Sequence, residues 1–164
     1  MLEGVRILDL KRITDDRGYF SEIMRSDWDE FLEGDEIVQS NLSISNPGVI
    51  RGWHRHERDQ VDYFLVIKGS MQICAFDEQS SELDEIIVND ENPKLIRIPG
   101  KYWHGTKNLG AEPSIIIYFH SKLYDYKNPD EGRRPWNDSA IIPKSVNGKT
   151  NDHRVGKPWN WSRL

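Results

Sequence analysis

Two histidines lie close together in the stretch VIRGWHRH, which runs from Val49 to His56. His54 and His56 are two positions apart, so on a β-strand both side chains would point to the same face. Imidazole is the commonest metal ligand in proteins and also the commonest general base near neutral pH. The spacing therefore supports three uses for the pair, namely binding a metal ion, moving a proton, or packing with satisfied hydrogen bonds.

A metal site needs three or four nitrogen, oxygen or sulfur ligands that converge about 2 Å from the ion. His54, His56, Gln60 and His104 could supply such a set, and their spacing resembles the two-part metal motif of cupin proteins. Cupins usually carry glutamate at the position of Gln60, and the neutral amide is a weaker ligand for iron, manganese or zinc. One interpretation is a metal-dependent cupin, and another is that a single one of these histidines is functional.

A base that removes a proton needs a partner that stabilises the charge it creates. The candidates that lie in or beside strand-like segments, and could share one cavity, are Arg51, His104, Tyr118, His120 and Tyr126. A buried tyrosine can equally be a packing residue with a satisfied hydroxyl. Packing is the simpler role for each candidate taken alone.

The segment DDRGYFSE places Arg17, Phe20 and Glu22 in a turn followed by a strand. Arginine binds phosphate through paired, charge-assisted hydrogen bonds, and an aromatic ring can stack on a nucleobase. The residues Asp16, Arg17 and Gly18 are also ordinary turn residues. This segment is therefore either part of a ligand site or a surface turn.

The segment EIVQSNLSIS alternates between apolar and polar residues, as a half-buried strand does. Its two faces carry Val38, Leu42 and Ile44 against Gln39, Asn41 and Ser43. The polar face could meet solvent, which is common. It could also line a barrel interior that holds a polar ligand.

The composition is that of a folded protein with one domain-sized core: 164 residues, 30% charged and 37% hydrophobic. A net charge of -5 argues against a broad nucleic-acid surface. The apolar runs fall well short of the roughly 18 residues that a membrane helix needs, and no signal-peptide pattern is visible. The single cysteine, Cys74, excludes an internal disulfide and favours a buried thiol in a reducing cytoplasm.

Strand signals dominate the chain, and polar stretches separate them at intervals typical of a sandwich or barrel. We expect strands in GVRILDL, EIVQSNLSIS, KLIRIPG and SIIIYFH, and a hairpin in DYFLVIKGSMQICAFD around Lys68, Gly69 and Ser70. One short helix is expected in DWDEFLEG, with Asp27 as its cap and Gly34 at its end.

Several motifs occur in order along the chain: DDRGYFSE, VQSNLSISNPGVIRGWHRH, Gln60, VIKGSMQICAFD, IPGKYWHG and YDYKNPDEGRRPWND. In this combination the sequence resembles the dTDP-4-dehydrorhamnose 3,5-epimerase family from about Val5 to Asp138. These are cupin-fold enzymes that act on nucleotide-linked 4-keto-6-deoxy sugars. The resemblance implies an all-β, cupin-type double-stranded β-helix, or jelly-roll barrel, with minor short helices. It also implies a single domain over residues 1–164, with the tail from about residue 139 packed on the barrel.

The resemblance assigns roles to single residues. His54, which follows the family's Arg-Gly-x pattern, would be the base. Tyr126 would return the proton, with Tyr124 as a neighbouring alternative. Pyrophosphate and nucleotide contacts would come from Arg17, Phe20, Glu22, Gln39, Asn41 and Arg51, and the pocket would also include His56, Gln60, His104 and Tyr118.

The chemistry of such a substrate explains these residue types. A ketone at C4 acidifies the protons at C3 and C5, so a base can remove one and leave an enolate. A donor on the opposite face then returns a proton with inverted configuration. Nothing in this scheme requires a metal or a nicotinamide, so we expect no cofactor.

The chain departs from the family pattern in three places. Asp62 stands where the family commonly has a lysine that stabilises the enolate, so Asp62 is protonated, points away, or is replaced in that role by another donor. His56 stands where the family usually has glutamine, and RG-x-H-x-H also occurs in related sugar 3,4-ketoisomerases. The family's acidic partner of the catalytic histidine lies near the C-terminus, where Asp152 is the candidate.

We therefore predict an epimerase, and so an isomerase, that acts at C3, C5 or both of a nucleoside-diphospho-4-keto-6-deoxy sugar in surface polysaccharide biosynthesis. Its catalytic residues would be His54, Tyr126 and Asp62. The alternatives are a 3,4-ketoisomerase of the same fold, the metal-dependent cupin above, and a non-catalytic nucleotide-sugar-binding protein. We expect neither nucleic acid nor membrane as a partner. Because family members are usually dimers that exchange an N-terminal strand, Arg17, Phe20 and Glu22 would reach the site of a second copy.

Overall fold

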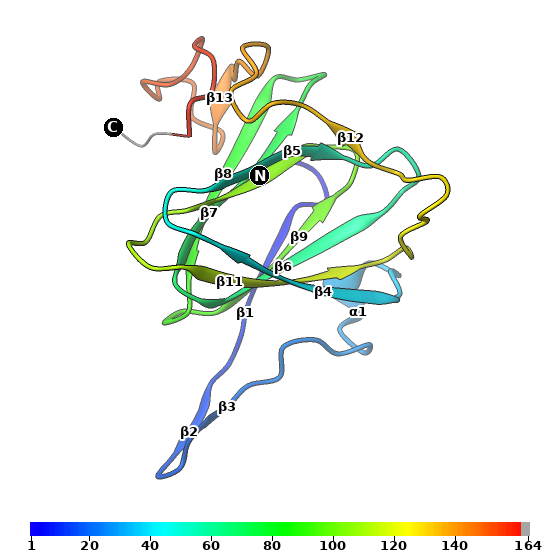
Figure 1. Ribbon diagram of the computed structural model, residues 1–164, viewed down its shortest axis with the longest axis vertical. Helices are drawn as coiled ribbons and strands as arrows, with labels where there is room; N and C mark the ends of the chain where they lie inside the picture. Colours follow the sequence, from blue (N-terminus) through cyan, green and yellow to red (C-terminus); the bar gives the residue numbers. More distant parts are fainter. Residues whose placement is uncertain (162–164) are drawn as a thin grey trace.

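Residues 1–161 are described in this computed structural model, and they form two β-sheets that face each other, together with one short helix (Figure 1). Almost all neighbouring strands are antiparallel, and side chains from both sheets fill the space between them. This arrangement confirms the predicted all-β barrel of the cupin type.

The first sheet has five antiparallel strands. In spatial order they are β1 (Arg6–Asp9), β9 (Lys94–Pro99), β6 (Val61–Lys68), β11 (Ser114–His120) and β4 (Gln39–Ser45). Strand β4 pairs with β11 on one side and is an edge of the sheet. An edge strand exposes unpaired backbone groups that another strand can use.

The second sheet has six strands. In spatial order they are β12 (Gly132–Arg133), β5 (Ile50–Arg55), β10 (Trp103–Asn108), β7 (Ser70–Asp77), β8 (Glu82–Asn89) and β13 (Ser145–Val146). Strands β6 and β7 flank Gly69, which has a φ of +85°. The turn forms where it was predicted, but the two strands belong to different sheets and do not pair with each other, so the predicted hairpin is wrong. The chain passes from the first sheet to the second at this point.

A separate two-stranded hairpin projects away from the barrel (Figure 1). It consists of β2 (Ile13–Asp15) and β3 (Gly18–Phe20), and all six of its strand residues are exposed. Its turn is the Asp16-Arg17-Gly18 segment, so turn chemistry does form there. Within residues 1–161 this hairpin forms a sheet of its own, separate from the two sheets of the barrel, and an isolated hairpin is only marginally stable.

The helix α1 spans Asp29–Leu32 and is shorter than the predicted segment. Trp28 is at the N-cap position without a capping side chain, and Asp27 instead accepts hydrogen bonds from Arg25. The prediction that Asp27 caps the helix is therefore wrong. Gly34, with a φ of +88°, follows the last turn as expected. In residues 1–161 no helix is long and apolar enough to cross a membrane.

The inner faces of the sheets are apolar at one end and polar at the other. The apolar end is built from alternate residues of five strands, among them Phe64, Val66, Met71, Ile73, Val88, Ile96, Ile98 and Ile116. Continuing the same face of β6 past Phe64 leads to Asp62, and the same face of β11 leads from Ile116 to Tyr118 and His120. The inward-facing residues of these two strands are therefore apolar at the core end and polar at the other end of the barrel.

The C-terminal tail packs on the outer face of the six-stranded sheet. Ile141, Trp159 and Trp161 are buried in a cluster with Trp53 of β5 and Phe76 of β7. The rings of Trp53 and Trp161 lie 4.6 Å apart, centroid to centroid. Because His54 follows Trp53 and points to the opposite face, this packing fixes the strand that carries His54.

Candidate active site

A cavity of about 570 Å³ lies between the sheets at the polar end of the barrel. Its size is typical of a site for a medium-sized organic ligand. Nine of the residues predicted from the sequence line it: Gln39, Asn41, Arg51, His54, His56, Gln60, Asp62, His104 and Tyr118. The structure therefore gathers residues from five strands, and from the segment before β6, at one chamber.

The alternating strand β4 has its polar face turned inward. Gln39, Asn41 and Ser43 line the cavity, while Leu42 on the opposite face is 62% exposed. This is the reverse of the usual arrangement for a small barrel. The polar face of β4 is therefore a cavity wall.

Two glycines bring strands β5 and β10 unusually close beneath the cavity. A Cβ atom on Gly105 would lie 2.8 Å from the carbonyl oxygen of Arg51 and 2.9 Å from the Cα of Gly52. Only glycine at both positions allows this approach. The close contact sets His54 and His104, which are cross-strand partners, next to each other on the cavity wall.

His54 has an acidic neighbour beside the adjacent strand. Its Nε2 lies 3.7 Å from Oε1 of Glu131, which directly precedes β12. Burial, together with nearby His104, lowers the pKa of His54, and Glu131 acts against that change. At neutral pH His54 is therefore biased toward the neutral form that can accept a proton.

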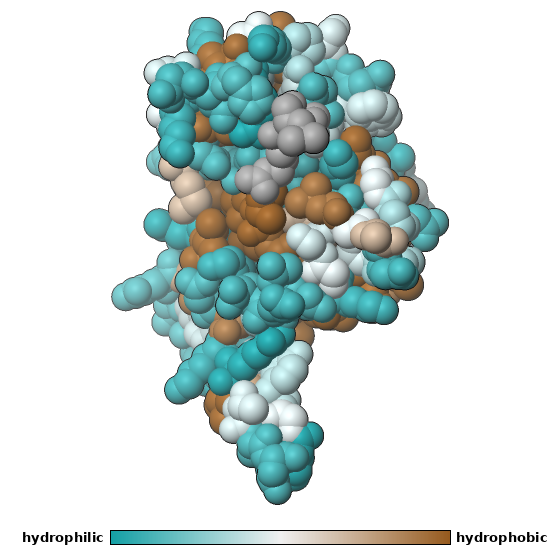
Figure 2. Space-filling model, turned by 90° about the vertical axis from the view of Figure 1, so that its left-hand side faces the viewer, coloured by the Kyte–Doolittle hydropathy of each residue, from teal (hydrophilic) through white to brown (hydrophobic). Residues whose placement is uncertain are grey.

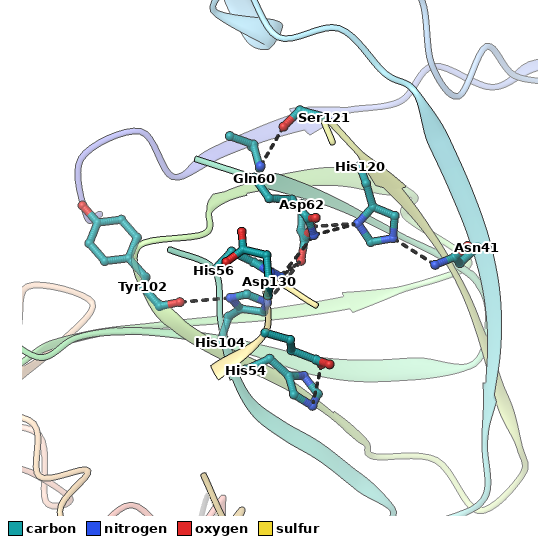
Figure 3. Close-up of polar contacts among 12 residues, drawn as sticks. Asn41, His54, His56, Gln60, Asp62, Tyr102, His104, His120, Ser121 and Asp130 are labelled. Carbon is teal, nitrogen blue, oxygen red and sulfur yellow. Dashed lines mark hydrogen bonds and ion pairs between the residues drawn. The ribbon is translucent and has the colours of Figure 1, made fainter. Parts of the chain in front are cut away.

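Asp62 is buried and sits among three histidines (Figure 3). Its Oδ2 lies 3.2 Å from Nε2 of His56 and 3.2 Å from Nε2 of His104. Its Oδ1 accepts hydrogen bonds from Nδ1 of His120 at 2.8 Å and from the Gln60 amide at 2.7 Å. Of the options for Asp62, pointing away from the site is therefore wrong.

The charge of Asp62 follows from these contacts. Burial by itself would raise the pKa of Asp62, but the contacts with His104, His120 and His56 outweigh burial and hold the pKa well below its usual range. Burial lowers the pKa of His56, but Asp62 and Asp130 outweigh it and raise the pKa overall. Asp62 is thus ionised, contrary to the option that it is kept protonated.

Positively charged and aromatic groups complete the chamber. Arg51 is held by hydrogen bonds from its guanidinium to Oγ of Ser45 and to the carbonyl of Ile44, both 3.0 Å. Tyr118 packs edge-on against Phe64, and burial raises its pKa. Lys122 and Arg133, which were not singled out in the sequence, also line the cavity. These cations suit a ligand that carries negative charge.

Four predicted site residues do not line the cavity of their own chain, and three of them lie on or beside the projecting hairpin. Arg17 and Phe20 lie on the projecting hairpin and Glu22 follows it, and Phe20 is 61% exposed. Arg17 donates to Asp15, and Glu22 pairs with Arg25. Within one chain these residues are remote from the chamber, so a role at the site requires a second copy.

The two tyrosines after β11 are placed differently from the prediction. Tyr124 lines the cavity, and its backbone N–H donates to Oε1 of Gln39 at 2.9 Å. Tyr126 is 87% exposed and packs edge-on against Tyr124. Within this chain Tyr124, and not Tyr126, therefore lines the cavity, and the role predicted for Tyr126 stays a prediction.

Asp152 also does not meet the prediction. It accepts hydrogen bonds from Arg154 at 2.9 Å and lies in the tail, away from the cavity lining. The acidic neighbour of His54 is Glu131, which sequence reasoning missed. Its only signal was its place in PDEGRR, directly after the tyrosines, since pairing between β12 and β5 is not visible in the sequence.

Comparison with known proteins connects this geometry to a family. A family model described as a polysaccharide biosynthesis C-terminal domain matches residues 13–131. The chain is 41% identical over 140 residues to the probable low-salt glycan biosynthesis epimerase Agl13 of Haloferax volcanii, covering 82% of this chain and 88% of the relative. It is 34% identical over 149 residues to the dTDP-4-dehydrorhamnose 3,5-epimerase of Methanothermobacter thermautotrophicus, covering 85% of this chain and 78% of the relative. The chain belongs to the dTDP-4-dehydrorhamnose 3,5-epimerase family.

The fold agrees with this membership. The crystal structure of the 3,5-epimerase RmlC from Legionella pneumophila, in complex with dTDP-4-keto-L-rhamnose, superposes with a TM-score of 0.76 at 22% identity. The match covers 97% of this chain and 95% of the RmlC chain. Membership of the epimerase family confirms the prediction that the protein is an isomerase.

Proposed function

We propose that this family member epimerises C3, C5 or both in a nucleoside-diphospho-4-keto-6-deoxy sugar during surface polysaccharide biosynthesis. The observation that carries the proposal is the pair of His54 and Glu131 on the wall of a cavity that holds further polar groups from both sheets. A base with an acidic partner, facing a chamber of this size, suits proton abstraction next to a ketone.

In this proposal Nε2 of His54 takes the proton from the carbon next to the C4 ketone. The electron pair of the broken C–H bond moves to the C4 oxygen and forms an enolate. Glu131, 3.7 Å from Nε2, stabilises the imidazolium that results. Reprotonation of the carbon on its other face inverts the configuration and returns the electron pair.

Tyr124 is the proposed donor for that second step. His54 lies on β5 of the six-stranded sheet, whereas Tyr124 is anchored to Gln39 on β4 of the five-stranded sheet. The two side chains thus approach the cavity from different sheets. An inverting enzyme needs its base and its acid on opposite faces of the reacting carbon.

The nucleotide and its phosphates would bind at the wall formed by β4 and Arg51. Gln39 and Asn41 offer amide groups there, and Arg51 adds a fixed positive charge. Arginine is suited to phosphate because its planar fork makes paired hydrogen bonds. Arg17, Phe20 and Glu22 of a second copy would complete this part of the site.

We infer a homodimer from two features that fit each other. The projecting hairpin exposes Ile13, Tyr19 and Phe20, and Figure 2 shows it extending from the body with a hydrophilic tip. Strand β4 is an open sheet edge whose outer face exposes Leu42 and Ile44. A hairpin from one copy that pairs with β4 of another would cover both surfaces, and two-fold symmetry would repeat the contact.

We place this reaction in the reducing cytoplasm. The single cysteine, Cys74, is buried and unpaired, and burial raises the pKa of its thiol well above the usual range. A protein whose cysteine serves as a packing residue does not depend on an oxidising compartment.

The experiment that tests the proposed function is isotope exchange. The protein is incubated in deuterated water with a panel of nucleoside-diphospho-4-keto-6-deoxy sugars that differ in base and sugar. We expect solvent deuterium at C3, C5 or both in at least one substrate, and the positions labelled show which carbons react. Absence of exchange with every member of the panel would contradict the proposal.

A further inference from the structure

Three electron-pair donors converge at one point on the cavity wall. They belong to Asp62, His56 and His104, each of which offers a ligand atom within 4.8 Å of the other two, and Oδ2 of Asp62 faces Nε2 of both histidines. Asp62 and His104 are buried and His56 is partly buried, and all three line the cavity. The cluster therefore combines burial with access to a ligand.

In both His56 and His104, Nδ1 is already hydrogen-bonded to a backbone carbonyl. Nδ1–H of His104 donates to the carbonyl oxygen of Tyr102 at 3.0 Å, and Nδ1–H of His56 donates to the carbonyl oxygen of Asp130 (Figure 3). A neutral imidazole carries one N–H, so in both rings Nε2 is left with a lone pair. Both lone pairs face the same carboxylate oxygen, which is itself an acceptor.

The other contacts of Asp62 form a contrast. His120 accepts from the Asn41 amide at Nε2, so its Nδ1–H is available to donate to Oδ1 of Asp62. Gln60 donates to the same oxygen, and its nitrogen also lies 3.1 Å from Nε2 of His56. Among residues 1–161, Nε2 of His104 meets the Asp62 carboxylate and no neutral donor. Oδ1 is satisfied by neutral donors, whereas Oδ2 faces two imidazole nitrogens, an arrangement that a shared cation, either a proton or a metal ion, satisfies.

We propose that Asp62, His56 and His104 bind one divalent transition-metal ion through Oδ2 and the two Nε2 atoms. Two ligands about 2.1 Å from a metal, at an angle of about 100°, lie about 3.2 Å apart. Oδ2 is 3.2 Å from each Nε2. Two imidazoles with one carboxylate suit zinc, iron, manganese or cobalt rather than magnesium or calcium. The two backbone carbonyls at Nδ1 are the outer partners that metal-binding histidines usually have.

This ligand set differs from the one that the sequence offered. His54 turns its Nε2 toward Glu131, and Gln60 turns its amide nitrogen, not its carbonyl oxygen, toward Asp62. Cupins usually have a glutamate at the position of Gln60. In this chain the carboxylate comes instead from Asp62, two residues later and on the same face of the chain. Substitution of the family's lysine by Asp62 thus creates the third ligand.

The position of the ion gives it a role. The binding site is argued from geometry alone, whereas the role rests on the proposed function. A divalent ion here would add positive charge to the wall that also carries His54, at the position where the family commonly has lysine. It would stabilise the negative charge that develops on the C4 oxygen when His54 removes the proton.

Metal analysis and cobalt titration of the full chain test the site. We expect about one transition-metal ion per chain after purification without chelator. After chelator treatment, Co²⁺ should bind with a visible absorption that saturates at one equivalent. Asp62→Asn and His104→Gln should each weaken Co²⁺ binding by roughly 100-fold. His153→Gln, at an exposed histidine outside the cavity, is the matched control and should bind normally.

His54→Gln separates this inference from the proposed function. It should keep full Co²⁺ binding while it loses isotope exchange, because His54 is not a ligand. Co²⁺ binding that is lost in His54→Gln, or unchanged in both Asp62→Asn and His104→Gln, would overturn the ligand set. Metal-free protein that gives no saturable Co²⁺ absorption would overturn the site and leave the exchange result standing. Circular dichroism of each chelated variant checks folding, and the double variant with His56→Gln and His104→Gln replaces Asp62→Asn if the latter does not fold.

Discussion

The carboxylate of Glu131 lies 3.7 Å from Nε2 of His54, which is on β5, and Glu131 directly precedes β12, the strand next to β5. This contact is built by the short strand β12, which pairs with β5 at Arg55 and His54. The segment that carries Glu131 is therefore positioned by backbone hydrogen bonds to the strand that carries His54, the proposed base. In this protein the acidic partner follows the tyrosine motif directly.

Replacing this partner should impair proton abstraction more than binding. We expect Glu131→Gln to lower kcat by roughly 10²-fold, because the neutral amide stabilises the imidazolium less well. KM should change little, and Glu131→Asp should recover part of the loss. Glu57→Gln, at an exposed carboxylate that pairs with Arg55, is the control and should keep normal kcat. An equal effect in Glu57→Gln would contradict a specific role for Glu131.

Substitution of the two tyrosines after β11 should have different effects on inversion. Tyr124→Phe removes the hydroxyl of a cavity-lining residue, so the variant should still exchange deuterium at the reacting carbon but invert it more slowly. Tyr126→Phe removes an exposed hydroxyl and should behave like the wild type. Product configuration and deuterium content are read together by NMR. The reverse order of effects would assign the donor role to Tyr126.

Replacing Asp62 with the lysine that the family commonly has should destabilise this protein. In Asp62→Lys a buried cation would replace the anion that accepts from His120 and Gln60 and faces His56 and His104. We expect the free energy of unfolding to fall by about 3–5 kcal/mol, as when a buried pair is broken. Urea unfolding of chelated protein measures it, with the exposed Asp16→Lys as control. A variant as stable as the wild type would show that the surrounding histidines do not depend on the charge of Asp62.

Mixed dimers test whether the projecting hairpin serves a second copy. Arg17→Ala and His54→Ala should each be inactive alone if Arg17 of one copy completes the site that contains His54 of the other. After unfolding and refolding together, the mixture should regain about one quarter of wild-type activity, because half of the dimers carry one intact site. Light scattering should give twice the 19.2 kDa chain mass for both variants. No recovery in a mixture that is dimeric would contradict the exchange of Arg17 between copies.

Much of the fold follows from local patterns in the sequence. The alternation in Gln39 to Ser45 predicts both the strand and a possible cavity wall, since period two holds wherever a strand has distinct faces. Strand β8 was not predicted, because the adjacent carboxylates Asp84 and Glu85 interrupt its apolar pattern. Those carboxylates are buried through contacts with the backbone of Leu2 and the side chain of Arg154, which are distant in sequence.

The active site was less predictable, because its key contacts link residues far apart in the chain. The family pattern identifies His54 and shows that Asp62 is unusual, but it does not show that Asp62 meets His104 and His120. The choice between Tyr124 and Tyr126 lies in a loop without hydrophobic periodicity, so no sequence rule determines which ring turns inward. Glu131 is visible only once β12 is seen to pair with β5.

The central claim, that His54 removes a proton next to the C4 ketone, is tested most directly by deuterium incorporation at C3 and C5 in the wild type and in His54→Gln. The measurement uses a 4-keto nucleotide sugar in deuterated water, with circular dichroism to show that the variant is folded. We predict exchange in the wild type and a loss of roughly 10²- to 10⁴-fold at every exchanging carbon in the variant. Exchange at the wild-type rate in folded His54→Gln would contradict the claim.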